Sequence, residues 1–313
     1  DASLSIIRSK KVGIIGYGSQ GKAHTKNLTD SGVNVKVGLR SNSSSIKTVI
    51  DDGFTFCPIE DIVKNSDVIC LLIPDSEIPS VYKSYVFDNL SKNKTILFAH
   101  GYSVNYKQIN IPNYVDVIMV APSGGGEMVR NEYKEGRGIP NLLAIHQNYS
   151  DTAMDVALSY SKAIGGTRSG AFISTFKEET ETDIFGEQVI LTGGIIELIK
   201  QSYNVLVEDG YNPITAWFVC YYETKSIIDL FHTKGFEFLN NEISDLAEYG
   251  GLTRGKRIIN KNVIKEMKII LDEIKSGHFK KEWDKETQSN FKTLKKMKSK
   301  VVDSDIEKLT KLM

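Results

Sequence analysis

The feature that most constrains the fold is a short apolar run, KVGIIGYGSQG at residues 11–21, which ends in Gly16-x-Gly18-x-x-Gly21. In a strand–turn–helix unit, Gly16 permits the tight turn, Gly18 lets the backbone approach a pyrophosphate, and Gly21 lets the helix pack closely on the sheet. A glycine-rich turn without a ligand is the alternative. Because a second apolar run at 35–39 completes a βαβ unit, the sequence predicts dinucleotide binding at a helix N-terminus.

The end of that second strand indicates which dinucleotide is bound. NAD sites commonly place an acidic residue about 20 residues beyond the glycines, where it holds the ribose 2′-hydroxyl. Here residues 38–45 read GLRSNSSS, which offers Arg40 and several hydroxyls, including Ser43 and Ser45, but no carboxylate. This set suits a 2′-phosphate. The pattern therefore favours NADP over NAD, although an ordinary polar turn has the same composition.

A change of periodicity divides the chain into two predicted domains. Short apolar runs alternate with helical stretches in residues 1–175, which is typical of a parallel sheet covered on both faces. Residues 176–313 show helical patterns alone. We therefore expect an α/β Rossmann-type doubly wound sheet followed by an all-α domain. The expected strands are 11–16, 35–39, 67–73, 95–99, 116–120 and 142–146; the expected helices of the second domain are 178–209, 213–234, 239–249, 260–276, 285–297 and 304–312.

Composition excludes several classes of partner. The formal net charge of the 313 residues is zero, so no global field attracts nucleic acid or a membrane surface. The three cysteines lack metal-ligand or redox spacing, and we interpret them as buried thiols in a reducing compartment. No apolar run reaches the roughly 20 residues of a membrane span, and no signal-peptide pattern is present. These features predict a soluble cytoplasmic protein with a small-molecule substrate.

Three places carry residues suited to chemistry. Asp183 and Glu187 lie four apart, so on a helix their carboxylates share a face and could hold Mg²⁺, although a solvated acidic turn has the same spacing. His100 follows an apolar strand and could act as an acid or base near the cofactor, or serve structure alone. The loop 121–126, which ends at Gly126, could pass close to a nicotinamide or substrate, or simply connect two elements.

Several strings resemble the ketol-acid reductoisomerase family in its short form. They are GYGSQGKAH, VGLR, FAHG, TFKEETETDIFGEQ, ETKSIIDL, ISDLAEYGG, LTRGKRII and SGHFKKEW, and they extend over nearly the whole chain. The resemblance implies an Mg²⁺-dependent alkyl shift in a 2-hydroxy-3-oxo acid, followed by reduction by NADPH, in branched-chain amino acid synthesis. It also implies a homodimer, or a higher assembly, with intertwined helical domains.

The resemblance assigns roles to individual residues. His100 is expected to be catalytic, with Ser244 contacting substrate and Glu223 serving both catalysis and metal binding. Glu223 and Ser244 are expected to enter the partner's site. The remaining roles are pyrophosphate binding by Tyr17, Gly18, Ser19 and Gln20, 2′-phosphate binding by Arg40, Ser43 and Ser45, and metal binding by Asp183, Glu187 and Glu223.

The chain departs from the family at residues that matter for the chemistry. The usual loop Pro-Lys-Gly-Pro-Gly-His becomes 122–127, PSGGGE, so that Ser123 replaces a lysine and Glu127 a histidine. Val219 replaces a metal-binding glutamate four residues before Glu223. Away from these positions, an aspartate after AEYG is replaced by Gly251. The family's GSQGHAH has a lysine, Lys22, in place of its first histidine.

These departures leave three functions to compare. The resemblance implies a site with two Mg²⁺ ions. Loss of one carboxylate leaves the second ion under-ligated, so one metal site is favoured over two. Alkyl migration depends on paired cations more than hydride transfer does. The leading hypothesis is therefore an NADPH-dependent reductase of a small oxo or imino acid with weakened or lost alkyl migration. The alternatives are an authentic ketol-acid reductoisomerase acting on 2-acetolactate and a catalytically idle NADP-binding protein.

Overall fold

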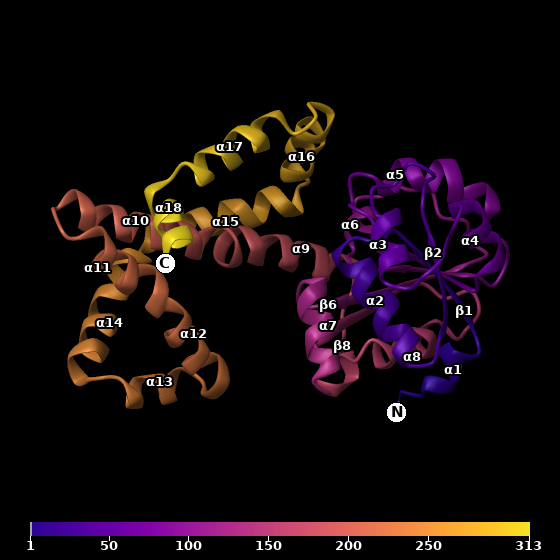
Figure 1. Ribbon diagram of the computed structural model, residues 1–313, viewed down its shortest axis with the longest axis horizontal. Coiled ribbons are helices and arrows are strands. Elements are labelled where there is room, and N and C mark those ends of the chain that lie inside the picture. The colour runs from indigo at the N-terminus through magenta and orange to yellow at the C-terminus, as the bar shows by residue number, and fades with distance from the viewer. Residues whose placement is uncertain (1) are drawn as a thin grey trace. The chain divides into compact units, whose positions relative to one another are not determined.

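The computed structural model describes residues 2–313 and divides into two compact units (Figure 1). One unit extends to Thr180 and the other comprises Glu181–Met313. The division falls inside helix α9 (Phe176–Gly186), which is helical on both sides of it.

The first unit is built on an eight-stranded sheet with strand order β3-β2-β1-β4-β5-β6-β7-β8. All six expected strands form, and two short ones are added at the edges. Neighbouring strands are parallel except β6 and β7, which are antiparallel. The strands are β1 (Lys11–Ile15), β2 (Asn34–Gly38), β3 (Phe56–Cys57), β4 (Val68–Leu71), β5 (Thr95–Phe98), β6 (Asp116–Pro122), β7 (Asn141–Gln147) and β8 (Ala171–Ile173).

The expectation of a parallel sheet holds for every neighbouring pair of strands except β6 and β7, where it was wrong. The apolar residues of β7 indicate burial, but their pattern carries no sign of the direction of the strand. The Rossmann-type order around β1, with β2 and β4 as its neighbours, holds as expected. The carboxyl ends of β1, β2, β4 and β5 therefore lie along one edge, where sheets of this type bind ligands.

Alternating side chains of the sheet enter two apolar cores. In β4, Val68 and Cys70 point into one core, and Ile69 and Leu71 into the other. Helices α1, α2 and α8 contribute to the first of these, and α4 and α5 to the second. The helices of this unit are α1 (Leu4–Arg8), α2 (Ser19–Asp30), α3 (Ile46–Asp51), α4 (Ile59–Asn65), α5 (Ile78–Val81), η1 (Tyr82–Val86), η2 (Phe87–Asn89), α6 (Tyr102–Asn105), α7 (Gly126–Lys134), α8 (Ala153–Ala163) and η3 (Gly166–Arg168).

One histidine of this core makes stability depend on pH. His24 of α2 is fully buried, its Nδ1 lies 2.9 Å from the Tyr160 hydroxyl, and burial lowers its pKa to about 3. The native state therefore keeps His24 neutral while the unfolded chain protonates it near pH 6.5. The stability due to neutral His24 is complete above pH 6.5 and is lost as pH falls toward 3.

We expect the free energy of unfolding to fall below pH 6.5 by up to about 1.4 kcal/mol per pH unit through this residue. Urea titrations at pH 5 and pH 7 measure this change, and the free energy of unfolding of His24→Asn should depend less on pH than that of the unmodified protein. The control is His232→Gln, which removes an exposed histidine and should keep the slope. An equal slope in both variants would show that other groups dominate.

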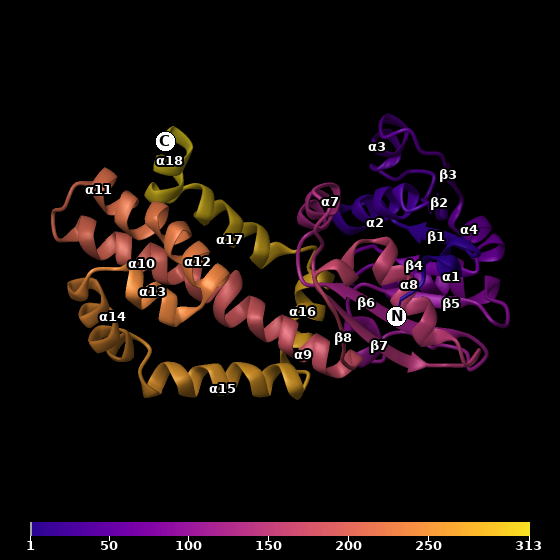
Figure 2. The same cartoon turned by 90° about the horizontal axis from the view of Figure 1, so that it is seen from below.

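The second unit consists of helices only (Figures 1 and 2). Its buried core is small and centres on Tyr203, Ala216, Trp217 and Ile306. The elements after α9 are η4 (Glu187–Leu191), α10 (Gly194–Glu208), α11 (Pro213–Trp217), η5 (Phe218–Tyr222), α12 (Glu223–Lys234), α13 (Phe236–Glu242), α14 (Asp245–Ile258), α15 (Lys261–Lys275), α16 (His278–Gln288), α17 (Lys292–Val302) and α18 (Asp305–Leu312).

Some helix boundaries differ from expectation for local reasons. The expected helix 239–249 is two helices, because Ser244 takes an extended backbone and its hydroxyl accepts from the Ala247 N–H as an N-cap. The expected helix 285–297 is broken at Asn290 and Phe291, both in the left-handed region. None of the described helices is long and apolar enough to cross a membrane. Of the three free cysteines, Cys70 alone is fully buried, whereas the other two are half-buried.

Candidate functional site

The glycine turn after β1 has the geometry expected of a pyrophosphate cradle. Gly16 has φ +97°, which other residues adopt only with strain, and a Cβ on Gly21 would lie 2.5 Å from the Gly16 carbonyl oxygen. Gly18 has ordinary extended angles at the N-cap of α2, and a Cβ there would meet no protein atom within 4 Å. Neither packing nor conformation therefore requires glycine at 18. Close approach of a pyrophosphate to the backbone of Gly18 stays our prediction for this position.

The predicted 2′-phosphate residues border the same turn. A pocket of about 260 Å³ is lined by Gly16, Tyr17 and Gly18 of the turn and by Arg40, Ser43 and Ser45 of the segment after β2. β1 and β2 are adjacent and parallel, so their carboxyl ends bring the two segments together. A dinucleotide with its pyrophosphate at the turn would place its adenosine ribose here.

Tyr17 is held in this turn by a polar network. Its hydroxyl donates to Asp52 at 3.1 Å, and Asp52 also pairs with Lys26 at 2.6 Å and with Lys22 at 3.1 Å. Burial and the neighbouring carboxylate raise the pKa of Tyr17, so its phenol stays neutral at physiological pH. Lys22, which departs from the family pattern, thus has a structural partner in Asp52.

The loop before α7 packs directly on the glycine turn. The Gln20 side-chain amide donates to the Gly124 carbonyl at 2.9 Å. A Cβ on Gly126 would lie 2.1 Å from the Ser19 carbonyl oxygen. The loop is therefore a packed element beside Ser19 and Gln20, and glycine at 126 is what allows α7 to approach α2.

We expect Gly126→Ala to destabilise the protein by about 1–3 kcal/mol, because the methyl group would overlap backbone atoms of Ser19. Gly125→Ala is the matched control: Gly125 has φ −64°, and a Cβ there meets nothing within 4 Å. Melting temperatures of both variants test this. A similar decrease in both would mean that loop flexibility, and not contact with Ser19, requires the glycines.

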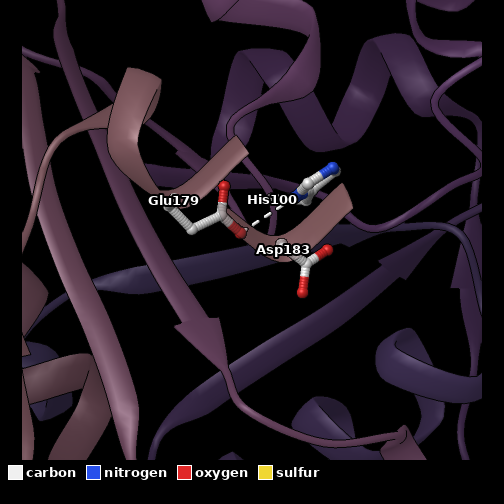
Figure 3. Close-up of side chains that lie close together, drawn as sticks. All are labelled: His100, Glu179 and Asp183. Carbon is white, nitrogen blue, oxygen red and sulfur yellow. Dashed lines mark hydrogen bonds and ion pairs between the residues drawn. The ribbon is translucent and has the colours of Figure 1, made fainter. Parts of the chain in front are cut away.

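His100 lies just beyond β5 in contact with a buried carboxylate (Figure 3). Its Nδ1 is 2.8 Å from Oε1 of Glu179, and the Gly101 N–H donates to Oε2 of the same side chain at 2.7 Å. Glu179 is 3% exposed and His100 remains partly accessible. With Nδ1 as the donor, the carboxylate fixes the tautomer in which Nε2 carries the lone pair of the ring.

Sequence reasoning missed Glu179. It lies 79 residues from His100 in the chain, and only the fold brings the two together. Its approach depends on Gly101, where a Cβ would lie 2.5 Å from both the Phe176 carbonyl oxygen and the Thr180 hydroxyl. One signal was present in the sequence: Glu179 precedes Asp183 by one helical turn, so both face the same way on α9.

Three side chains form a group suited to a metal ion. His100, Glu179 and Asp183 each offer a ligand atom, and these atoms lie within 4.8 Å of one another (Figure 3). Two carboxylates at this spacing suit a hard divalent cation. Glu187 is exposed at the start of the π-helix η4, one turn after Asp183, and the chain is helical between them. Asp183 and Glu187 thus remain our predicted metal carboxylates.

The other predicted residues lie in the second unit. Glu223 is exposed at the start of α12, directly after the π-helix η5. Val219, at the position of the missing carboxylate, lies within η5 and is 48% exposed. Ser244 is exposed at the N-cap of α14. Two predicted metal carboxylates therefore adjoin π-helices, which often mark functional sites.

The first unit combines a Rossmann-type sheet with a glycine turn, an adjoining pocket and a histidine–carboxylate pair at the same strand ends. These features together define a dinucleotide-dependent oxidoreductase. Comparison with known proteins agrees. The acetohydroxy acid isomeroreductase NADPH-binding domain matches residues 6–170, and the ketol-acid reductoisomerase C-terminal domain matches residues 176–313. The chain belongs to the ketol-acid reductoisomerase family, in its short form.

Individual relatives support this assignment over the full length. The ketol-acid reductoisomerase (NADP(+)) of Methanopyrus kandleri is 47% identical over 309 residues, which cover 99% of this chain and 94% of the relative. The structure of an NADH-preferring ketol-acid reductoisomerase from an uncultured archaeon matches with a TM-score of 0.97 at 38% identity, over 100% and 97% of the two chains. A semialdehyde dehydrogenase NAD-binding protein from Cupriavidus necator shares only the fold, with a TM-score of 0.64 at 16% identity over 85% of this chain and 99% of that one.

Proposed function

We propose that this protein is an NADPH-dependent reductase of the family that acts on a small 2-oxo or imino acid and catalyses alkyl migration weakly. One observation carries the proposal. Ser123 and Val219 occupy the positions where the family resemblance places a lysine and a metal carboxylate, while the dinucleotide turn and the His100–Glu179 pair are intact.

The two half-reactions differ in what they require of these residues. Alkyl migration needs a deprotonated hydroxyl and a polarised neighbouring carbonyl, whereas hydride transfer needs one electrophilic stabiliser or proton donor. Asp183 and Glu187 would hold Mg²⁺, which when bound supplies Lewis acidity to the substrate oxygens. His100, oriented by Glu179, would exchange a proton with the substrate oxygen. Without a carboxylate at 219, a second ion has fewer ligands, so migration is affected more than reduction.

The second candidate is an authentic ketol-acid reductoisomerase that tolerates both substitutions. The full-length identity to the Methanopyrus kandleri enzyme favours it. In that case water would replace the missing carboxylate as a ligand. The catalytically idle NADP-binding protein, our third hypothesis, predicts no turnover with any substrate.

One comparison of substrates separates these functions. NADPH oxidation is measured with 2-acetolactate and with its methyl-migrated isomer, 3-hydroxy-3-methyl-2-oxobutanoate, each with Mg²⁺ and with EDTA. Our proposal expects reduction of the isomer to be at least about tenfold faster than turnover of 2-acetolactate, a difference of about 1.4 kcal/mol in barrier. Equal rates would identify an authentic reductoisomerase. If neither turns over, other 2-oxo acids and cyclic imino acids are screened, and failure of all would leave the idle protein.

The same proposal predicts how activity can be restored. Val219→Glu combined with Ser123→Lys should raise the rate of 2-acetolactate turnover while leaving the rate of reduction of the isomer within about threefold.

We further propose a homodimer, or a higher assembly, in the reducing environment of the cytoplasm, in which Glu223 and Ser244 complete the partner's site. Large apolar side chains exposed on the second unit support this, among them Phe236, Leu246 and Tyr249.

A further inference from the structure

The ribose pocket contains an acidic residue that the proposed function does not use. Glu77 lines the pocket together with Arg40, and its Oε2 lies 2.7 Å from the Arg40 guanidinium. Glu77 comes from the segment after β4, and Arg40 from the segment after β2, on opposite sides of β1. The pair therefore spans the carboxyl edge of the sheet beside the glycine turn.

The backbone of Glu77 is firmly placed. Its N–H donates to the Pro74 carbonyl at 2.8 Å, and its own carbonyl accepts from the Ser80 hydroxyl at 2.9 Å. The next residue, Ile78, is 2% exposed in the core. The carboxylate is thus presented at the pocket by an anchored turn and not by a mobile loop.

NADPH and NADH differ only at the adenosine ribose, which carries a 2′-phosphate in one and a 2′-hydroxyl in the other. A 2′-phosphate on Arg40 would share that guanidinium with the Glu77 carboxylate, and the two anions repel. A 2′-hydroxyl could instead donate to the carboxylate, as ribose hydroxyls do in NAD sites. Glu77 would thereby supply, from the segment after a different strand, the acidic group that is missing at the end of β2.

We propose that Glu77 is a cofactor-specificity residue, which lowers the preference for NADPH and permits use of NADH by holding Arg40 and accepting from the ribose. This inference rests on the proposed function, because it assumes that the cofactor lies in this pocket. Arg40 and Glu77 are 46% and 41% exposed at their side chains, so solvent screens the pair and the expected effects are moderate.

The test measures dissociation constants of NADPH and NADH by fluorescence titration of the full-length protein at about 0.1 M salt. Glu77→Gln should bind NADPH about threefold to fivefold more tightly and NADH no more tightly, so that the NADPH-to-NADH preference rises at least threefold. Asp51→Asn is the matched control, since it removes one carboxylate from another exposed ion pair, with Lys47, that does not line the pocket. Its preference should stay within twofold of the unmodified protein. A rise below threefold in Glu77→Gln, or an equal rise in Asp51→Asn, would overturn the inference.

A further variant distinguishes failure of this inference from failure of the proposed function. Arg40→Gln should weaken NADPH binding about tenfold or more and spare NADH. If Arg40→Gln behaves so while Glu77→Gln changes nothing, the cofactor site stands and the role of Glu77 is refuted. If Arg40→Gln binds both cofactors unchanged, the cofactor lies elsewhere, and the proposed site fails together with the inference.

Discussion

Asp183→Asn is expected to abolish the rise in melting temperature that Mg²⁺ produces and to lower turnover by about 10³-fold. The amide keeps the size of the side chain, but it is neutral and offers one oxygen acceptor in place of two. A hard cation held largely by carboxylates loses most of its affinity in that case. Loss of a Lewis acid removes several kcal/mol of transition-state stabilisation, which corresponds to the stated decrease.

Thermal melts with and without about 10 mM Mg²⁺, which is in excess of the dissociation constant of a weak site, measure directly how Mg²⁺ binding stabilises the fold. Glu181→Gln is the matched control, because it removes a carboxylate two residues earlier on the same helix, outside the group around His100. It should retain the Mg²⁺-dependent shift. An unchanged shift in Asp183→Asn would place the ion elsewhere in the molecule.

Glu179→Gln is expected to lower kcat about 10²-fold without changing the dissociation constant of NADPH. The glutamate accepts hydrogen bonds from both the His100 ring and the Gly101 N–H. The glutamine amide has an oxygen that accepts and an NH2 group that only donates, so this NH2 group would face one of the two N–H donors. Glu179 is 3% exposed, so water cannot relieve that conflict, and the His100 ring loses its fixed orientation.

Two measurements test the role of Glu179: steady-state kinetics with whichever of 2-acetolactate and its isomer is turned over faster, and titration with NADPH. Glu178→Gln is the control: it neutralises the adjacent carboxylate, which accepts from the Ser174 hydroxyl at 3.0 Å and is exposed. Its kcat should stay within about threefold of the unmodified protein. A kcat for Glu179→Gln in the same range would show that His100 acts without its carboxylate partner.

The first βαβ unit was predictable because its constraints are local. Gly16 and Gly21 stand where a turn and a close approach require glycine, and the structure confirms both. The direction of β7 was not predictable, since its run of apolar residues reads the same whichever way the strand points. The helical periodicity of residues 239–249 predicted one helix. The structure has two, because Ser244 caps the second helix with a hydrogen bond that the periodicity does not reveal.

Parts of the site also lay beyond sequence reasoning. The partner of His100 is 79 residues distant, and the partner of Arg40 is 37 residues distant. Such pairs depend on which strand ends lie side by side, and this is a property of sheet order. By contrast, Asp183 and Glu187 could be paired from spacing on one helix, and their assignment to a metal stays a prediction.

The small core of the second unit has a consequence for how the chain is made. The first unit buries two large apolar cores around its sheet, so we expect it to fold once about 180 residues have left the ribosome. The second unit buries a small cluster around Trp217 and leaves large side chains such as Leu246 exposed. We propose that this unit completes its fold only against a second copy of the chain. Recovery of the fold after dilution from denaturant should therefore slow as protein concentration falls, and nascent chains should depend on holding chaperones until they meet.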